Sequence, residues 1–366
     1  MTATHAGRGR HWRTWAPPLA GLAVSGLEHA HLLHVDNVWV ALLVFLILLG
    51  SVFAAVHHAE VVALKVGEPL GSIVLALAVT AIEASLIVAA MLSAGGEENA
   101  LARDAVFAAV LIVLNGVVGF CLLIGGLRYH EQSYRLEGAA SALSVLSTLA
   151  VLTLILPNFT LAKLGPQYSP AQLAFIGVLS LILYGVFVFV QSVRHRDYFL
   201  VEAGDDFGEA PAPPSAAATG ASAALLFVSL AAVVLLAEAL AGPQERAIQA
   251  LGLPPSFLGV VIASLVLLPE SVAALKAAVA NRVQTSLNLA LGSALACIGL
   301  TIPVVGAVSL YLGRELTLGL DAEETALLLL TLLVSSLTLA TGRATILQGA
   351  VHLVIFAAFL LLAAVP

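Results

Sequence analysis

Ten long runs of apolar residues, almost free of charge, constrain the fold of this chain more than any other feature. Most of these runs reach the roughly 20 residues that an α-helix needs to cross a bilayer. Inside lipid the backbone must satisfy its own hydrogen bonds, and a continuous apolar run does so as a helix. The sequence therefore predicts an all-α integral membrane protein with spans near residues 37–56, 72–93, 105–127, 139–157, 170–191, 221–241, 256–280, 285–311, 324–340 and 344–365.

The composition agrees with a membrane protein and disfavours other classes. Hydrophobic residues fill 60% of the 366 positions and charged residues 10%, whereas a soluble domain carries roughly a quarter charged residues. A soluble enzyme is therefore disfavoured, and the lipid bilayer is the expected surrounding. The formal net charge of -7 argues against a nucleic-acid partner, because proteins that bind nucleic acid present a basic face.

A shorter apolar stretch, Trp15 to Leu27, precedes the ten runs and could be an eleventh span or the core of a signal peptide. The Lys and Arg residues favour a span, since these residues collect on the cytoplasmic side of membrane proteins. With eleven spans, eleven of the 15 Lys and Arg residues fall on one side. We therefore expect about 11 transmembrane helices, with the N-terminus in the cytoplasm and the C-terminus outside.

The longest polar stretch, residues 192–220, is rich in acids and prolines and divides the chain. We expect residues 1–35 to hold a basic tail and the first helix, 36–191 a five-helix repeat, and 221–366 a second five-helix repeat. An odd number of helices per half inverts the second half, as in many secondary transporters. The cytoplasmic linker carries four acids that are by default solvated and could alternatively sense cytosolic calcium: Glu202, Asp205, Asp206 and Glu209.

Two glutamates, Glu83 and Glu270, lie deep within apolar runs, each 11 or 12 residues after a glycine (Gly71 or Gly259). A charged side chain at this depth costs at least a few kcal/mol, and no Lys or Arg near mid-span can pair with either one. One alternative is that a glutamate is protonated and only hydrogen-bonded. The functional interpretation is a facing pair of carboxylates, a hard oxygen site that binds a metal cation or protons but not both.

Residues beside the two glutamates can add neutral oxygens. Thr80 lies one turn before Glu83 and shares its helix face. Pro269 has no backbone N–H, so the carbonyl of Leu265 loses its usual helical partner. A carbonyl left free at membrane depth is tolerated where it lines a cavity, and there it can bind a cation.

The helices that follow each glutamate carry a matching pair of polar and small residues. These pairs are Asn115 with Gly116 and Gly292 with Ser293. Asn115 and Ser293 are candidate oxygen ligands, although such residues often only bond helices together in membranes. Gly116, Gly292 and Pro269 are places where helices could bend or slide. In the last run, His352 is expected to be a hydrogen-bonded packing residue.

At these residues the sequence resembles the calcium/cation antiporter superfamily, specifically its bacterial ChaA-type calcium/proton antiporters. The resemblance implies a first helix outside two inverted five-helix repeats, an acidic segment between them, and a location in the bacterial inner membrane. It also implies that Glu83 and Glu270 bind cation and proton in alternation. Four stretches carry it: HHAEVVALKVGEPLGSIVLALAVTAIEASLI, ARDAVFAAVLIVLNGVVGFCLLIGGLR, LPESVAALKAAVANRVQTSLNLALGSALACIGLTIPVV and TGRATILQGAVHLVIFAAF.

These observations predict a transporter that exchanges cytosolic Ca2+ for protons and needs no cofactor. The wider superfamily often has a Gly-Asn pair shortly before its glutamate, whereas this chain has Val79-Thr80 and Leu268-Pro269. A Na+(K+)/H+ antiporter on the same scaffold therefore stays an alternative. A cation channel would need a continuous polar pore, and a membrane metalloenzyme would need histidines at helical spacing, such as H-E-x-x-H, which the sequence lacks.

Overall fold

The computed structural model describes residues 12–30, 32–33, 35, 37–67, 70–93, 98–199 and 214–366. Within them the chain is mostly helical, as expected, and ten helices are long and apolar enough to cross a membrane. These ten coincide with the ten apolar runs of the sequence. The linker acids Glu202, Asp205, Asp206 and Glu209 lie outside the described residues. The chain forms two compact units, and each unit draws helices from both sides of the linker.

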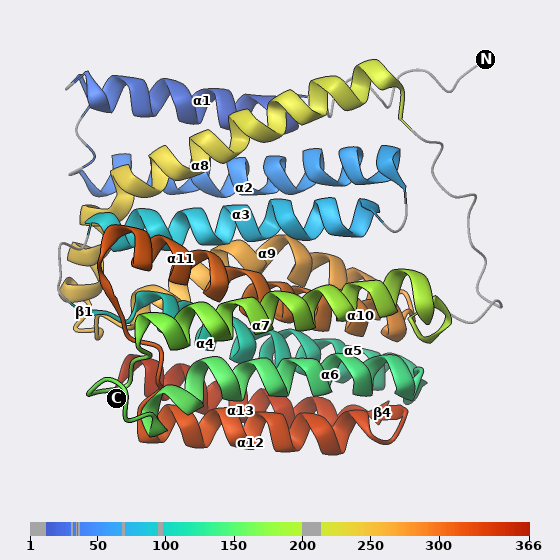
Figure 1. Ribbon diagram of the computed structural model, residues 1–366. Helices are drawn as coiled ribbons and strands as arrows, with labels where there is room; N and C mark the ends of the chain where they lie inside the picture. Colours follow the sequence, from blue (N-terminus) through green and yellow to red (C-terminus); the bar gives the residue numbers. More distant parts are fainter. Residues whose placement is uncertain are drawn as a thin grey trace, which may run out of the picture. The chain divides into compact units, whose positions relative to one another are not determined.

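The first unit combines Met1–Gly95 with Ala210–Gly252. Its helices are α1 (Trp12–His29), α2 (Val38–Val66), α3 (Leu70–Ser93) and α8 (Ala216–Ala250). Helix α8 crosses α1 and α2 obliquely (Figure 1) and packs against α1, α2 and α3. The short first helix, α1, has 18 residues and is not among the ten candidate spans, so its crossing of the membrane stays a prediction.

Local sequence signals set the ends of the helices in the first unit. Helix α2 begins after Asn37, whose side chain accepts a hydrogen bond from the backbone N–H of Trp39 at 2.8 Å. It ends at Gly67, which has a φ of 74° that favours glycine. Helix α8 starts at Ala216, before the expected run at 221, because the Ser215 side chain accepts the N–H of Ala218.

The second unit combines Gly96–Glu209 with Leu253–Pro366. Helix α9 packs on both α4 and α10, α5 packs on α13, α6 packs on α10 and α12, and α7 packs on α11. The α-helices of this unit are α4 (Leu101–Leu111), α5 (Val118–Tyr129), α6 (Leu136–Ala150), α7 (Pro170–Phe189), α9 (Phe257–Val279), α10 (Val283–Ala296), α11 (Ile302–Leu312), α12 (Ala322–Leu339) and α13 (Ile346–Ala364).

Several spans of the second unit contain turns of π-helix or 3-10 helix. The span Leu101–Tyr129 runs α4, η1, α5, and Val283–Leu312 runs α10, η6, α11. A π segment within a helix widens one turn and often marks a functional site. The segments are η1 (Ile112–Val117), η2 (Val151–Ile155), η3 (Leu156–Phe159), η4 (Val190–Arg194), η5 (Arg196–Tyr198) and η6 (Cys297–Thr301), of which η3 and η5 are 3-10 helices.

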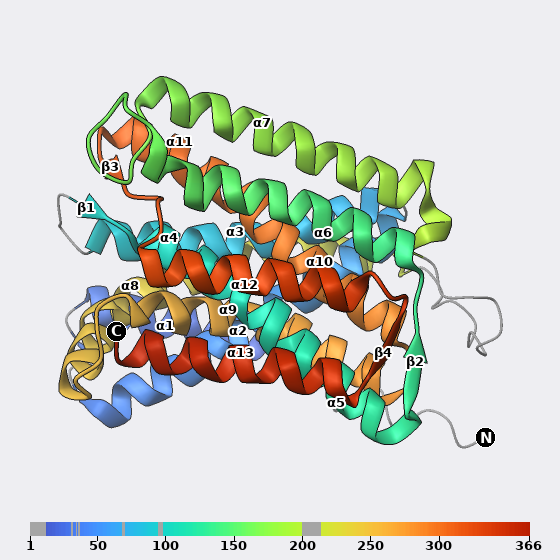
Figure 2. The same cartoon turned by 90° about the horizontal axis from the view of Figure 1, so that it is seen from below.

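Two very short sheets tie loops together at opposite ends of the second unit (Figure 2). At one end β1 (Glu98–Asn99) pairs in parallel with β3 (Glu315–Leu316). At the other end β2 (Glu131–Ser133) pairs antiparallel with β4 (Arg343–Thr345). The sheets fix the loops that lead into α4, α6, α12 and α13, and so hold the ends of these spans in register.

Candidate functional site

Glu83 and Thr80 lie together on α3 in the first unit, as predicted. Both are 4% exposed, and their spacing of three residues places them on one helix face. The Thr80 Oγ1 atom is buried and has no hydrogen-bond partner among the described residues. A buried hydroxyl without a partner costs free energy, so a ligand that uses this oxygen would offset that cost.

Glu270 lies on α9 in the second unit and is half-buried. Helix α9 continues through the buried Pro269 without a break. Because proline has no N–H to offer the carbonyl of Leu265, that oxygen lacks its usual helical donor. The helix itself is held close to α4, since a Cβ atom on Gly259 would lie 2.7 Å from the backbone N of Ala105.

Asn115 lies in the π segment η1 and is fully buried. Its Nδ2 donates to Thr331 Oγ1 at 2.8 Å, and its Oδ1 lies 3.1 Å from Nδ1 of His352. Its neighbour Gly116 packs against the ring of Phe356, where a Cβ atom would come within 3.1 Å. Gly116 therefore allows close packing of η1 on α13.

Ser293 and Gly292 lie in the regular helix α10 and are both half-buried. A Cβ atom on Gly292 would meet no atom within 4 Å. The π segment of this span, η6, begins at Cys297 and so does not include the pair. Helices α9 and α10 both pack against η1, so the second unit brings together the elements that carry Glu270, Asn115 and Ser293.

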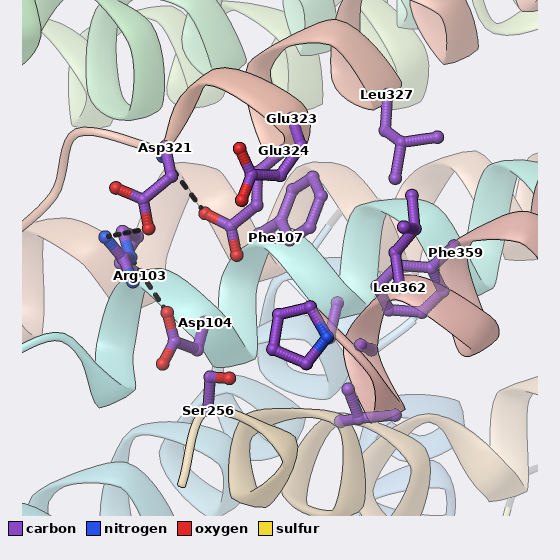
Figure 3. A pocket seen from close by; sticks show the side chains of 14 residues that line it. Arg103, Asp104, Phe107, Ser256, Asp321, Glu323, Glu324, Leu327, Phe359 and Leu362 are labelled. Atoms are coloured by element: carbon purple, nitrogen blue, oxygen red, sulfur yellow. Dashed lines mark hydrogen bonds and ion pairs between the residues drawn. The ribbon is translucent and has the colours of Figure 1, made fainter. Parts of the chain in front are cut away.

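A pocket of about 100 Å3 opens in the second unit between the starts of α4, α9 and α12 (Figure 3). Arg103 donates from Nε to Asp104 at 2.8 Å and from Nη1 to the Gly319 carbonyl at 3.1 Å. Its Nη1 also lies 3.8 Å from Asp321 Oδ2. The pocket is acidic, because one guanidinium faces four carboxylates: Asp104, Asp321, Glu323 and Glu324.

Three carboxylates of this pocket, those of Asp104, Asp321 and Glu324, have structural partners that limit their use as ligands. Glu324 accepts the backbone N–H of Asp321 at 3.2 Å and completes the cap of α12. In the described residues no group of three or more His, Cys, Asp or Glu side chains is placed to hold a metal ion. This pocket was not among the predicted sites, although the acids of Asp321–Glu324 at the start of a span are a visible sequence signal for it.

Comparisons with known proteins identify the family. Residues 37–193 and 221–365 match the family described as sodium/calcium exchanger protein. The chain is 52% identical to y4hA of Sinorhizobium fredii, provisionally named an ionic transporter, over 96% of both chains. It is 36% identical to the sodium-potassium/proton antiporter ChaA of Escherichia coli, over 87% of both chains.

A solved structure shows the same fold. The Ca2+/H+ antiporter protein YfkE matches with a TM-score of 0.72 and 16% identity, covering 96% of this chain and 99% of that chain. The resemblance seen in the sequence is thereby confirmed, and the relatives are transporters. The chain belongs to the sodium/calcium exchanger protein family, within the calcium/cation antiporter superfamily, and is a multi-pass membrane protein.

Proposed function

We propose that the protein is a secondary active transporter that exchanges cytosolic Ca2+ for protons at a site that contains Glu83 and Glu270. One observation carries this proposal. Each glutamate is the 14th residue of an apolar membrane-spanning helix, counted from Leu70 in α3 and from Phe257 in α9. Two carboxylates near the middle of apolar spanning helices call for a functional reason, because an ionised carboxylate in hydrocarbon is costly.

The charge of the pair explains the exchange. One Ca2+ or two protons bring two facing carboxylates to neutrality, whereas the empty pair would carry two negative charges into a closing, low-dielectric path. The empty carrier therefore does not return, and cation and protons move in alternation. In this proposal Thr80, Asn115, Ser293 and the carbonyl of Leu265 supply neutral oxygens to the cation.

Alternating access would come from the two inverted five-helix repeats, or helices within them, moving around the fixed acids. Pro269, Gly116 and Gly292 are the proposed places where helices bend or slide. The site lies in the bacterial inner membrane, with the N-terminus in the cytoplasm and the C-terminus outside. No cofactor takes part, and the linker acids are a candidate calcium sensor.

A second candidate is exchange of Na+ or K+ for protons on the same scaffold. The 36% identity to ChaA, which is named a sodium-potassium/proton antiporter, favours this candidate. A cation channel is the alternative from another class of protein. All three use the same membrane-embedded acids, so transport measurements must separate them.

The test uses the purified chain in liposomes with an imposed pH gradient and a panel of Ca2+, Na+ and K+. We expect proton-driven uptake of Ca2+, and we expect Glu83→Gln and Glu270→Gln each to abolish it while the protein still inserts. A neutral amide carries no exchangeable acid proton and gives a divalent ion one less negative charge. Glu238→Gln is the matched control, because Glu238 is an exposed glutamate of the spanning helix α8.

Three outcomes would contradict the proposal. Uptake of Na+ or K+ without uptake of Ca2+ would show that the protein exchanges a monovalent cation for protons, so Ca2+ would not be its transported ion. Substantial transport by either glutamine variant would remove that residue from the mechanism. Persistent Ca2+ efflux with protons and competing cations withheld from the opposite side, at clamped membrane potential, would indicate a channel.

A further inference from the structure

A chain of buried polar side chains in the second unit joins η1, α12 and α13. Asn115 is bonded to Thr331 and to His352, and Nε2 of His352 lies 3.1 Å from Oγ1 of Thr338. Asn115 and Thr331 are 0% exposed and His352 is 1% exposed. Thr331 and Thr338 are seven residues apart, two turns along one face of α12. Asn115 and His352 have no visible relation in the sequence, because 237 positions divide them.

With the Asn115 carboxamide oriented as in the structure, the donors and acceptors of this chain match in one neutral arrangement. The Nδ2 group of Asn115 donates to Thr331, so its Oδ1 is the acceptor that faces His352. Nδ1 of His352 must therefore carry a hydrogen. In the neutral imidazole Nε2 is then an acceptor, and the hydroxyl of Thr338 is its donor. Both ends of the Asn115 carboxamide are fixed, and the imidazole is held in one tautomer.

The surroundings of His352 hold it in place from two further directions. Its Cβ atom packs closely on α5, because a Cβ atom on Gly119 would lie 3.1 Å from it. The turn of α12 that carries Thr338 is anchored through its carbonyl, which accepts from Tyr134 Oη at 2.9 Å and from Thr341 Oγ1 at 3.0 Å. The imidazole therefore holds a fixed position between α12 and η1, with a hydrogen bond to each.

We propose that His352 is a positioning residue for cation binding, which fixes the carboxamide oxygen of Asn115 in the orientation that the transported cation uses. This inference rests on the proposed function, since it takes Asn115 as a ligand. A carbonyl oxygen has two lone pairs, so Oδ1 can accept from His352 and still bind a cation. Without the donor at Nδ1, the carboxamide can turn and present its NH2 group, which repels a cation.

The test compares His352→Leu, which removes both hydrogen bonds, with His352→Asn, whose amide nitrogen can replace Nδ1. Cation affinity is measured as the KM of exchange in liposomes, apart from kcat, and as stabilisation of the purified protein against heat by CaCl2, NaCl or KCl. We expect His352→Leu to weaken affinity about ten-fold, the size of one buried hydrogen bond. His352→Asn should restore affinity to within about two-fold of the wild type, and kcat should change less than KM.

Two further variants separate positioning from packing. Asn115→Ala and the Asn115→Ala/His352→Leu double variant complete a double-mutant cycle. Because His352 acts through Asn115, the double variant should have the same affinity as Asn115→Ala alone. His58→Leu is the matched control: His58 is also a buried histidine, 3% exposed, with Nε2 bonded to the Thr14 carbonyl at 3.0 Å, and it should leave cation affinity unchanged.

The results that overturn the positioning role differ from those that overturn the proposed function. Additive losses in the cycle, or equal losses in His352→Asn and His352→Leu, would refute positioning. An 15N NMR spectrum showing hydrogen on Nε2 rather than Nδ1 of His352 in the wild type would refute it without any variant. The proposed function would be refuted if the protein showed no proton-coupled exchange. If the double-mutant cycle were still non-additive when cation binding is measured by thermal stabilisation, the positioning of Asn115 by His352 would be supported even so.

Discussion

Replacing Gly259 by alanine should destabilise the second unit measurably. A Cβ atom at this position would lie 2.7 Å from three atoms of α4: the N of Ala105, and the carbonyl C and the Cβ of Asp104. Ordinary contact begins near 3.4 Å, so α9 and α4 must separate by 0.7 Å or distort. Two of the three atoms belong to the backbone and cannot rotate away. Overpacking of this kind typically costs about 1–3 kcal/mol.

The assay is unfolding of the purified protein in mixed micelles by titration with sodium dodecyl sulfate, followed by tryptophan fluorescence. The matched control is Gly292→Ala, also within a spanning helix of the second unit, where a Cβ atom meets nothing within 4 Å. Because alanine favours a helix over glycine by about 0.5–1 kcal/mol, the control should be neutral or stabilised. Equal midpoints for both variants would refute the close approach of α9 to α4. If α4 also positions Glu270 through α9, exchange by Gly259→Ala should slow as well.

Three other predictions follow from the site and its surroundings. Raising the pH from 6 to 9 on the cation-loading side should speed transport, because protons and cation compete for the same carboxylates; cation affinity that stays flat would contradict a shared site. Thr80→Val should weaken cation affinity with little change in the SDS midpoint, because it removes a buried hydroxyl that has no partner in the described part of the chain; equal affinity would remove Thr80 from the ligands. Lys163 hydrogen-bonds to Glu315 at 2.9 Å and lowers the pKa of this exposed carboxyl. The contribution of this pair to folding stability is therefore full above the pKa that Glu315 has in the unfolded chain, and it disappears as the pH falls through the pKa of Glu315 in the folded protein. Lys163→Ala should bring the pKa of Glu315 back up toward its ordinary value in 13C NMR, and an unchanged pKa would contradict the pairing.

The spans were predictable from the sequence because the bilayer selects them by length and apolarity. All ten apolar runs are helices, and local signals explain where the helices exceed the runs. Helix α2 continues to Val66 through His57, His58 and Glu60, because no glycine or proline interrupts these residues before Gly67. Hydropathy measures the transfer of residues from water into lipid, so it does not indicate where a helix continues beyond the hydrocarbon into the membrane interface.

The interior of the second unit was less predictable, since it depends on contacts between distant residues. The expected equivalence of Asn115-Gly116 and Gly292-Ser293 came from spacing alone. In the structure Gly116 packs against Phe356 in a π segment, whereas Gly292 faces open space in a regular helix. His352 was expected to be a hydrogen-bonded packing residue. Its hydrogen-bond partners could not be predicted, because they lie in other helices.

The interleaving of the two units has a consequence for biosynthesis. The first unit needs α8, yet the whole of residues 94–215 separates α8 from α3. During translation α1, α2 and α3 must therefore wait without their fourth helix while three of the seven described candidate spans of the second unit are made. Neither half of a chain cut in the linker holds a complete unit, so fragments ending at residue 199 and beginning at residue 214 should be degraded when made alone. Made together in one cell, they should protect each other.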